Sequence, residues 1–500
     1  MRNEIEGSKR SGTFTISPGK TLSGELAFKG PNTSLHLHDR ASFDTHAIPE
    51  LCITGILEDL TKVSLIRCVT PPVPGSGWRG KESYYFADIF PHYVIYGDHH
   101  VRSADKAVAE IQFVVDDAST LFYDFDAFSS VIKPLPFIEQ ISHANGLNRE
   151  ILTGPYPAIL YFTGKTEIFA VDTLFGGLSA YHNPRQSFGG PDGVYLKNNI
   201  YVKLAFKEPW AFEDAVDQIL VVLRYLEMLV GRPQNLLELR LRIESDEETP
   251  VMLEVYWSTP PKRDQVHEER KPHPADVLLN GGMQPELFSR VTRSWLDRQQ
   301  TWQDARLRFS NSFAKQNFYD IDRLVGSANM FDILPQSAVP AMAQLSKEIE
   351  DAKETCQKIF GQLPSSTERD SVLSSLGRVG KSNLKQKIRH RAQIITDLVG
   401  DRPWFPELTF VTDEAVNCRN HYVHGSEPRF NYSENFEAVV FFTNTLEFVF
   451  AASDLIEAGW DMIAWRGNGT TMAHPFGAYY ADYDLCLQNL KPLLPRRRES

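Results

Sequence analysis

The chain has 500 residues and a formal net charge of −12 at pH 7, with 42% hydrophobic and 23% charged residues. This length predicts two or three domains with sizeable cores rather than one. The acidic balance argues against a protein coated with nucleic acid, because phosphate binding requires positive charge, although it leaves room for a local basic site.

Cysteine usage and the apolar segments indicate a protein of the reducing cytoplasm. The five cysteines are scattered and no CxxC pair occurs, so neither a disulfide framework nor a zinc ribbon is expected. The first residues, MRNEIEGSKRSG, are charged and predict no signal peptide. The most apolar long segment, from Ala438 to Ala458, contains Glu447, Asp454 and Glu457, so we expect a buried helix there and no membrane span.

The first half of the chain has the pattern of β-strands. Short runs rich in β-branched and aromatic residues are separated by Gly, Asn and Asp, which is typical of antiparallel strands. A hairpin turn is expected at Asn198-Asn199. In chain order the runs are TFTISP, LSGELAFKG, LCITGILED, KVSLIRCV, HYVIYG, VAEIQFVVDD, PAILYFTG, TEIFAVDT, GVYLKNNIYVKLAF, LELRLRIES and VMLEVYWS.

One helix interrupts these strands, in EPWAFEDAVDQILVVLRYLEMLVGRP. Pro209 stands near its start and Gly231 just after its end, and apolar residues recur at helical spacing between them. We therefore predict a mostly antiparallel β domain over residues 1–258. The polar, proline-rich stretch 259–279 is the expected linker.

Beyond the linker the apolar residues recur at helical spacing. We predict an all-α bundle with a C-terminal extension over residues 280–500, and hence an α+β fold class for the chain. The expected helices are QPELFSRVTRSWLDRQQTWQDARLRF, NFYDIDRLVGSANMF, AMAQLSKEIEDAKETCQKIFG, LKQKIRHRAQIITDLVG, VTDEAVNCRNHYVHG and SENFEAVVFFTNTLEFVFAASDLIEAG.

The segment VTDEAVNCRNHYVHGSEP concentrates groups that can do chemistry. Thr412 or Asp413 can cap a helix of about twelve residues that ends before Gly425. At about 100° per residue, one cation, one amide and one imidazole fall on an arc of roughly 140°. Such groups can also simply cap carbonyls at a helix end, so the arc alone does not establish a site. These three residues are Arg419, Asn420 and His424.

A basic stretch lies upstream, in GRVGKSNLKQKIRHRAQ, which holds six Lys or Arg residues and no acidic one. In an acidic protein this reversal of charge indicates either a solvated helix face or a surface that binds phosphates. GRVGKS lacks the four-residue gap of a phosphate loop, so nucleotide binding is not expected there. The residues that would bind phosphates, such as those of RNA, are Lys381, Lys385, Lys387, Arg389 and Arg391.

CRNHYVHG resembles the signature of HEPN domains, in which a polar residue follows an arginine and a histidine stands five positions after the arginine. Arg419, Asn420 and His424 occupy those positions. The basic helix upstream and the long apolar helix downstream also resemble the HEPN bundle. GKTLSGELAFKG and LCITGILED resemble the N-terminal domain of ApeA-type anti-phage proteins, whose C-terminal half is a HEPN domain. The resemblance covers nearly the whole chain.

The resemblance implies an RNA endonuclease of abortive-infection defence that needs neither metal nor cofactor, with tRNA as one candidate substrate. Such enzymes use the RNA 2′-hydroxyl as nucleophile and leave a 2′,3′-cyclic phosphate. His424 would move the proton, Arg419 would bind the scissile phosphate, and Asn420 would orient His424 or bind a phosphate oxygen. His421 would be a supporting residue at best. The N-terminal domain would sense or regulate, with an unknown phage-derived trigger as partner.

The sequence is compatible with more than one assembly and more than one function. HEPN domains commonly pair, and the wide arc between Arg419 and His424 is a physical reason to expect a homodimer or higher homo-oligomer, in which a second protomer completes the site. Alternatively, the bundle could hold RNA or a partner without cutting. The β half could also bind a carbohydrate or another ligand beside a merely structural bundle. His36 and His38 share one face of a strand, but no spacing there identifies a metal site.

Overall fold

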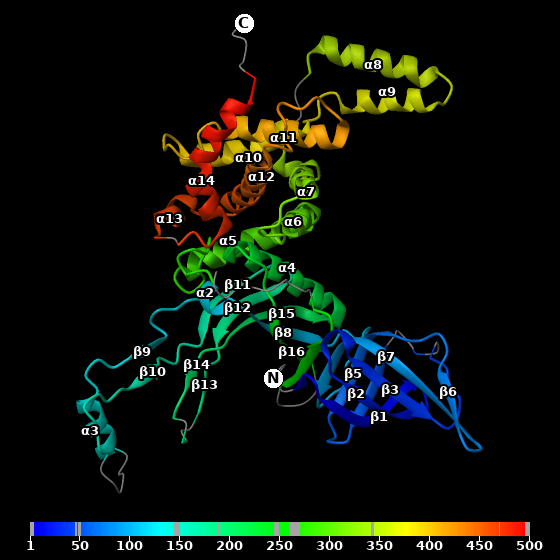
Figure 1. Ribbon diagram of the computed structural model, residues 1–500, viewed down its shortest axis with the longest axis vertical. Coiled ribbons are helices and arrows are strands. Elements are labelled where there is room, and N and C mark those ends of the chain that lie inside the picture. The colour runs from blue at the N-terminus through cyan, green and yellow to red at the C-terminus, as the bar shows by residue number, and fades with distance from the viewer. Residues whose placement is uncertain are drawn as a thin grey trace. The chain divides into compact units, whose positions relative to one another are not determined.

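The chain forms two compact units, a first unit of residues 1–296 and a second unit of residues 297–500 (Figure 1). The first unit is mostly antiparallel β-sheet and the second is helical, so the predicted α+β fold class is confirmed. The computed structural model describes residues 5–45, 48, 52–144, 151–187, 190–191, 193–244, 250–260, 271–341, 345–469 and 471–495.

The first unit is built on one large antiparallel sheet. Two small sheets, β9-β10 and β13-β14, stand apart from it. The strands of the unit are β1 (Lys9–Ser17), β2 (Lys20–Ala27), β3 (Ser34–Asp39), β4 (Ile53–Leu57), β5 (Lys62–Val69), β6 (Gly75–Arg79), β7 (Glu82–Gly97), β8 (Val108–Val115), β9 (Phe128–Ser130), β10 (Leu160–Phe162), β11 (Glu167–Asp172), β12 (Gly176–His182), β13 (Arg185–Gln186), β14 (Leu196–Lys197), β15 (Ile200–Trp210), β16 (Leu236–Ile243) and β17 (Val251–Trp257). Its helices are η1 (Gly30–Asn32), α2 (Ala118–Leu121), α3 (Leu135–Ala144), α4 (Phe212–Val230) and most of α5 (Pro285–Asp297).

The N-terminal strands close into a barrel. The pairings run β7-β3-β2-β1-β4-β5, and β5 pairs back to β7. Alternate apolar residues of these strands point inward, so Phe14, Leu26, Leu35 and Leu65 lie in a fully buried core. Strand β7 is 16 residues long and also extends beyond the barrel, because its start pairs with β6 and its end pairs with β17.

From β17 the sheet continues open, in the order β17-β16-β8-β15-β12-β11. Helix α4 packs on β8 and β15 with its apolar stripe buried, and it ends at Gly231, whose φ of 86° is left-handed, as the sequence predicts. The hairpin predicted at Asn198-Asn199 is wrong, because β14 pairs with β13 and β15 pairs with β12. Helix α3 was not predicted, and none of its residues is buried.

The predicted linker, 259–279, lies partly outside the described residues, which resume at Lys271. Its last residues pack on the first unit: Leu278 is buried and its N–H donates to the Leu229 carbonyl. The following helix, α5, packs on α4, where the hydroxyls of Tyr225 and Thr292 lie 3.0 Å apart. The predicted domain bounds, 1–258 and 280–500, stay predictions.

The second unit is a helical bundle around α12, which packs against α6, α7, α10, α11 and α14. The single helix predicted across residues 284–309 breaks at Arg298 into α5 and α6. Helices α8 and α9 form a side-by-side hairpin without a buried residue (Figure 1). The helices are α6 (Gln299–Phe313), α7 (Ile321–Asp332), η4 (Gln336–Ala338), α8 (Lys347–Gln362), α9 (Thr367–Arg378), α10 (Leu384–Val399), α11 (Leu408–His424), α12 (Phe436–Glu457), α13 (Met462–Gly467), α14 (Pro475–Leu490) and η5 (Lys491–Leu493).

Helix α12 is held by buried ion pairs. Both oxygens of Glu447 accept from the Arg323 guanidinium at 2.8 Å, and Asp454 accepts from Arg306 at 2.9 Å. Burial alone would raise the pKa of Asp454, but Arg306 and Arg298 lower it below its ordinary value. Among the described residues, α12 is the one helix long and apolar enough to cross a membrane, yet 83% of its apolar window is buried in the unit, as expected of a core helix.

Candidate active site

Helix α11 carries the predicted site residues. It begins at Leu408, a turn earlier than expected, because Leu408 and Val411 are buried and extend its apolar face. Thr412 is therefore buried inside the helix, where its hydroxyl donates to the Thr409 carbonyl instead of capping. The end is as predicted: Gly425 adopts a left-handed φ of 67° and closes the helix directly after His424.

The structure brings Arg419 and His424 into contact within one chain. An Arg419 Nη1 hydrogen donates to His424 Nε2 at 2.9 Å. The two Cα positions lie about 140° apart around the helix axis, but the long arginine side chain spans that arc at the end of the helix. The geometric reason for expecting a second protomer to complete the site is therefore removed.

The hydrogen bond defines the protonation of the imidazole in this arrangement. A guanidinium has only donors, so His424 Nε2 must supply the lone pair. The ring is then neutral, with its proton on Nδ1. His424 is also exposed to solvent. It is thus an accessible imidazole that can accept a proton at Nε2 once Arg419 releases it.

Two further residues hold the guanidinium, and both lie on α7, where no sequence pattern indicates a site. Asn329 Oδ1 accepts from Arg419 Nη2 at 2.8 Å, and an Asp332 carboxylate oxygen lies 3.8 Å from the same nitrogen. Asn420 holds the other side, since its Oδ1 accepts from Nη1 at 3.1 Å. Asn420 thus contacts Arg419 directly, whereas the sequence interpretation considered contacts with His424 or phosphate.

The charge of Arg419 is poorly neutralised. Its close partners, two amide oxygens and an imidazole, are uncharged, and the carboxylate of Asp332 is longer-range and 42% exposed. The Arg419 side chain itself is 12% exposed, and its Nε has no hydrogen-bond partner among the described residues. A partly buried cation with neutral neighbours is suited to bind an anion.

The basic helix α10 lies beside this cluster. Its spacing divides the cations between two faces, since residues two apart in a helix do not face the same way. Lys385 and Arg389 face α11: Lys385 Nζ donates to Asn417 Oδ1 at 2.7 Å, and Arg389 Nε donates to Asp413 at 2.8 Å, which raises the pKa of Arg389. Lys387 Nζ donates at 2.7 Å to the backbone carbonyl of Asp332 on α7.

Arg391 does not fit the prediction of RNA binding. Its side chain is fully buried, with Nη1 2.8 Å from Glu457 and its guanidinium 5.1 Å from the centre of the Trp302 ring. Burial lowers its pKa, although Glu457 opposes that shift. Position 391 faces the core because it continues the buried stripe of Ile388 and Ala392. Lys381, by contrast, is exposed just before α10 begins.

The other reactive side chains near α11 have structural surroundings. His421 Nδ1 lies 2.7 Å from the Ser426 carbonyl, so this ring holds the loop after the helix. Cys418 is fully buried, and burial raises the pKa of its thiol to about 12, which disfavours a thiolate nucleophile. Within the described ranges no group of three or more His, Cys, Asp or Glu could hold a metal ion.

Comparison with protein families agrees with this division of the chain. A family model described as ApeA N-terminal domain 1 matches residues 9–295. A second, described as Apea-like HEPN, matches residues 325–462 and so contains every residue of the cluster around Arg419. Neither the comparison with curated proteins nor that with solved structures finds a match.

Proposed function

The chain belongs to the ApeA family and carries an Apea-like HEPN domain, and from this premise we propose that it is an RNA endonuclease whose active site is the Arg419/His424 pair. HEPN domains are generally ribonucleases. The observation that carries the proposal is the 2.9 Å contact between Arg419 Nη1 and His424 Nε2. It joins a poorly neutralised cation to an exposed base, which are the two groups that cleavage by a 2′-hydroxyl requires.

The proposed reaction begins when a scissile phosphate binds Arg419. The Nη1 hydrogen that bonds His424 Nε2 then bonds a phosphate oxygen instead, which frees the lone pair of Nε2. His424 then takes the proton of the 2′-hydroxyl as that oxygen attacks phosphorus. Arg419 stabilises the charge on the non-bridging oxygens, and Asn420 and Asn329 keep its fork in place. The P–O5′ bond breaks, the 5′-oxygen takes a proton from solvent, and a 2′,3′-cyclic phosphate remains.

RNA would reach the site along α10. Lys385 and Lys387 have uncharged partners, the Asn417 amide oxygen and a backbone carbonyl, so their charges stay available to flanking phosphates. Arg389 is already paired with Asp413 and contributes less. Lys381 extends the same basic surface toward solvent.

The test uses full-length protein, a labelled RNA and a copy with one 2′-deoxy position at the cleavage site, in EDTA. Bulk tRNA serves as a second substrate. We expect cleavage of RNA to a cyclic phosphate and no cleavage at the 2′-deoxy position. His424→Ala should lower the rate on the order of 100- to 10,000-fold, whereas His390→Ala, a histidine on α10, is the matched control.

Other outcomes would change the assignment. Cleavage that requires Mg²⁺, or that persists at the 2′-deoxy position, would indicate a different nuclease chemistry. Binding of RNA without cleavage by wild-type protein would favour the alternative, a bundle that holds RNA or a partner without cutting. Wild-type activity of the folded His424→Ala variant would remove His424 from the mechanism.

We further propose that the nuclease acts in the cytoplasm in abortive-infection defence, with the first unit responding to a phage-derived trigger, and that it self-associates through the second unit. Family membership supports the role in defence, and phage plating on cells with wild-type or His424→Ala protein tests that role. Light scattering tests the self-association.

Because each chain already pairs Arg419 with His424, mixing Arg419→Ala and His424→Ala chains should restore no activity. Recovery of activity would reveal a site shared between two chains.

A further inference from the structure

Four rings form a row on the outer surface of the barrel. Tyr84 and Phe86 point outward from β7, and His36 and His38 point outward from β3, whose register places His38 opposite Phe86. Neighbouring ring centres lie 6.0–6.2 Å apart, and neighbouring planes differ by only 28–30°. The four rings therefore form a continuous aromatic surface, here called the ring shelf, outside the sealed barrel core.

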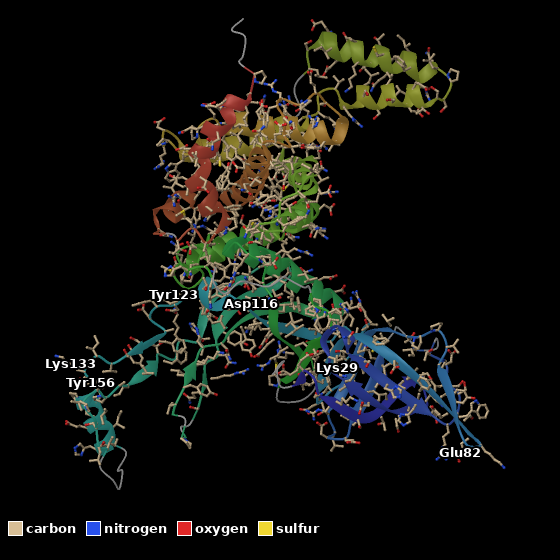
Figure 2. The ribbon with its side chains drawn as sticks, viewed as in Figure 1. Lys29, Glu82, Asp116, Tyr123, Lys133 and Tyr156 are labelled. Atoms are coloured by element: carbon tan, nitrogen blue, oxygen red, sulfur yellow. The ribbon has the colours of Figure 1, made fainter. Side chains whose placement is uncertain are left out.

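Glycines on β6 hold the β7 end of the ring shelf flat. Gly75 stands opposite Phe86 and Gly77 opposite Tyr84. A Cβ at Gly75 would lie 2.5 Å from the Phe86 ring, and one at Gly77 would lie 2.4 Å from the Tyr84 ring, so each ring lies directly over a glycine. The glycine covers one face of each ring, which favours the opposite face for binding. The β6–β7 hairpin extends to a tip at Glu82, labelled in Figure 2.

The ring shelf lines an open hollow of about 840 Å³, bounded on its other side by β2 and by Arg40. The carboxylates nearby are already engaged: Lys20 Nζ lies 2.9 Å from Asp39, and His36 Nδ1 lies 2.8 Å from Asp88. Arg40 is exposed, and its guanidinium has no ion-pair partner among the residues that the structure describes. The hollow thus offers a ligand aromatic rings, the Ser23 hydroxyl and the exposed Arg40 guanidinium.

This combination selects for a planar, anionic ligand. Stacking on Tyr, Phe and His rings is a general way of binding nucleobases, and a free guanidinium suits a phosphate. A neutral sugar would also pack on rings, but it favours carboxylate or amide acceptors for its hydroxyls, and the one carboxylate in the described lining, Asp39, is already paired with Lys20. We propose that this hollow binds a nucleotide, with the base on the ring shelf and the phosphate on Arg40, either as a free nucleotide or within a single strand.

The experiment uses full-length His424→Ala protein, so that no probe is cut, and isothermal titration calorimetry. The probes are the four nucleoside 5′-monophosphates, the matching nucleosides, ribose 5-phosphate and a single-stranded DNA hexamer. We expect at least one monophosphate to bind. Its nucleoside and ribose 5-phosphate should bind at least about tenfold more weakly, because each keeps only one of the two contacts. If the monophosphate binds tenfold more tightly than the hexamer, the ligand is a free nucleotide. If the hexamer binds tenfold more tightly, the ligand is a single strand.

Variants locate the binding. His38→Ala should weaken both the monophosphate and its nucleoside by about tenfold, whereas Arg40→Gln should weaken the monophosphate alone. Both positions are exposed, so folding should survive, and thermal unfolding checks it. Phe90→Ala, an exposed ring on the same strand outside the hollow, is the matched control. Monophosphate binding that is lost in the double variant Lys385→Gln/Lys387→Gln, made in the same background, belongs to α10 and not to the hollow.

Three results would overturn the proposal. One is that no monophosphate and no hexamer binds at millimolar concentration. Another is binding that both His38→Ala and Arg40→Gln leave unchanged. The third is a neutral oligosaccharide, cellohexaose, that binds more tightly than every monophosphate and is weakened by His38→Ala but not by Arg40→Gln. None of these results depends on whether the second unit cleaves RNA.

Discussion

Arginine charges are neutralised in the core of the second unit but much less so on its α7–α11 surface. In the core, Arg323 of α7 donates to both oxygens of Glu447 at 2.8 Å, and the pair is almost completely buried. At the surface, Arg419 is held by amide oxygens and an imidazole, and its carboxylate partner, Asp332, is 3.8 Å away.

The difference separates a charge that holds the fold, Arg323, from a charge that the proposed function assigns to a ligand, Arg419. A buried cation without its anion is strongly destabilising, so Arg323 needs Glu447. Arg419 is positioned by neutral groups, which fix its direction without cancelling its charge. Helix α7 serves both purposes, because Arg323 near its start faces α12 while Asn329 and Asp332 near its end face Arg419. Stability and activity should therefore respond to different arginines.

The largest effect should come from the core pair. Glu447→Gln leaves the Arg323 charge buried without its anion and should lower the free energy of unfolding by about 3–5 kcal/mol. Urea unfolding followed by circular dichroism measures it. Glu437→Gln, an exposed acid on the same helix, is the control and should have little effect. A loss below about 1 kcal/mol would mean that the two kinds of arginine do not differ in this way.

Arg419 should show the converse. Arg419→Ala should lower RNA cleavage on the order of 100- to 1,000-fold, the range found for the loss of one charge-stabilising donor. Its free energy of unfolding should change by no more than about 1 kcal/mol. Arg429→Ala, in the loop after α11, is the matched control. Unfolding of Arg419→Ala at lower urea concentration, in step with its activity loss, would return Arg419 to a structural role.

The lysines of α10 should have a smaller effect, on binding rather than on the chemical step. Lys385→Gln with Lys387→Gln should weaken RNA binding at low salt and flatten its dependence on salt by about 1–2 in log–log slope, because up to two phosphate contacts are lost. Filter binding across a salt series measures this. Lys358→Gln on α8 is the control. An unchanged slope would make these lysines a solvated face.

The smallest effect is expected at Asp332. Asp332→Asn removes a half-exposed carboxylate near Arg419 while keeping a side-chain oxygen, so RNA binding should tighten by about twofold to fivefold, the size of a weak surface ion pair. The same filter-binding assay detects it. Weaker binding by Asp332→Asn would show that Asp332 orients Arg419 more than it opposes RNA.

Local sequence rules predicted the parts of this site that lie within one helix. The end of α11 at Gly425 follows from the tolerance of glycine for a left-handed φ. The spacing of Arg419 and His424 follows from the HEPN signature. The contact between them was not predicted, because Cα angles around a helix ignore the reach of an arginine side chain. Asn329 and Asp332 were also missed, since they come from a helix ninety residues away and share no pattern with α11.

Burial explains the remaining misses. Arg391 has the same local composition as its basic neighbours, and the partners that hold it in the core, Glu457 and Trp302, come from helices distant in the chain. The closure of the barrel through β5 and β7 likewise depends on long-range pairing. Strand patterns in the sequence predict each strand separately, but they do not predict which two strands pair to close the barrel.

The order of these elements along the chain has a consequence for synthesis. All the barrel strands lie within residues 9–97, so the barrel can close while the ribosome is still translating the rest, since N-terminal domains fold first. The proposed nuclease site is completed much later: His424 must emerge, and Glu447 must follow before α12 can anchor α7. A nascent chain released before residue 424 contains all the barrel strands and lacks the Arg419–His424 pair. Under the proposed function, such a fragment would not cleave RNA.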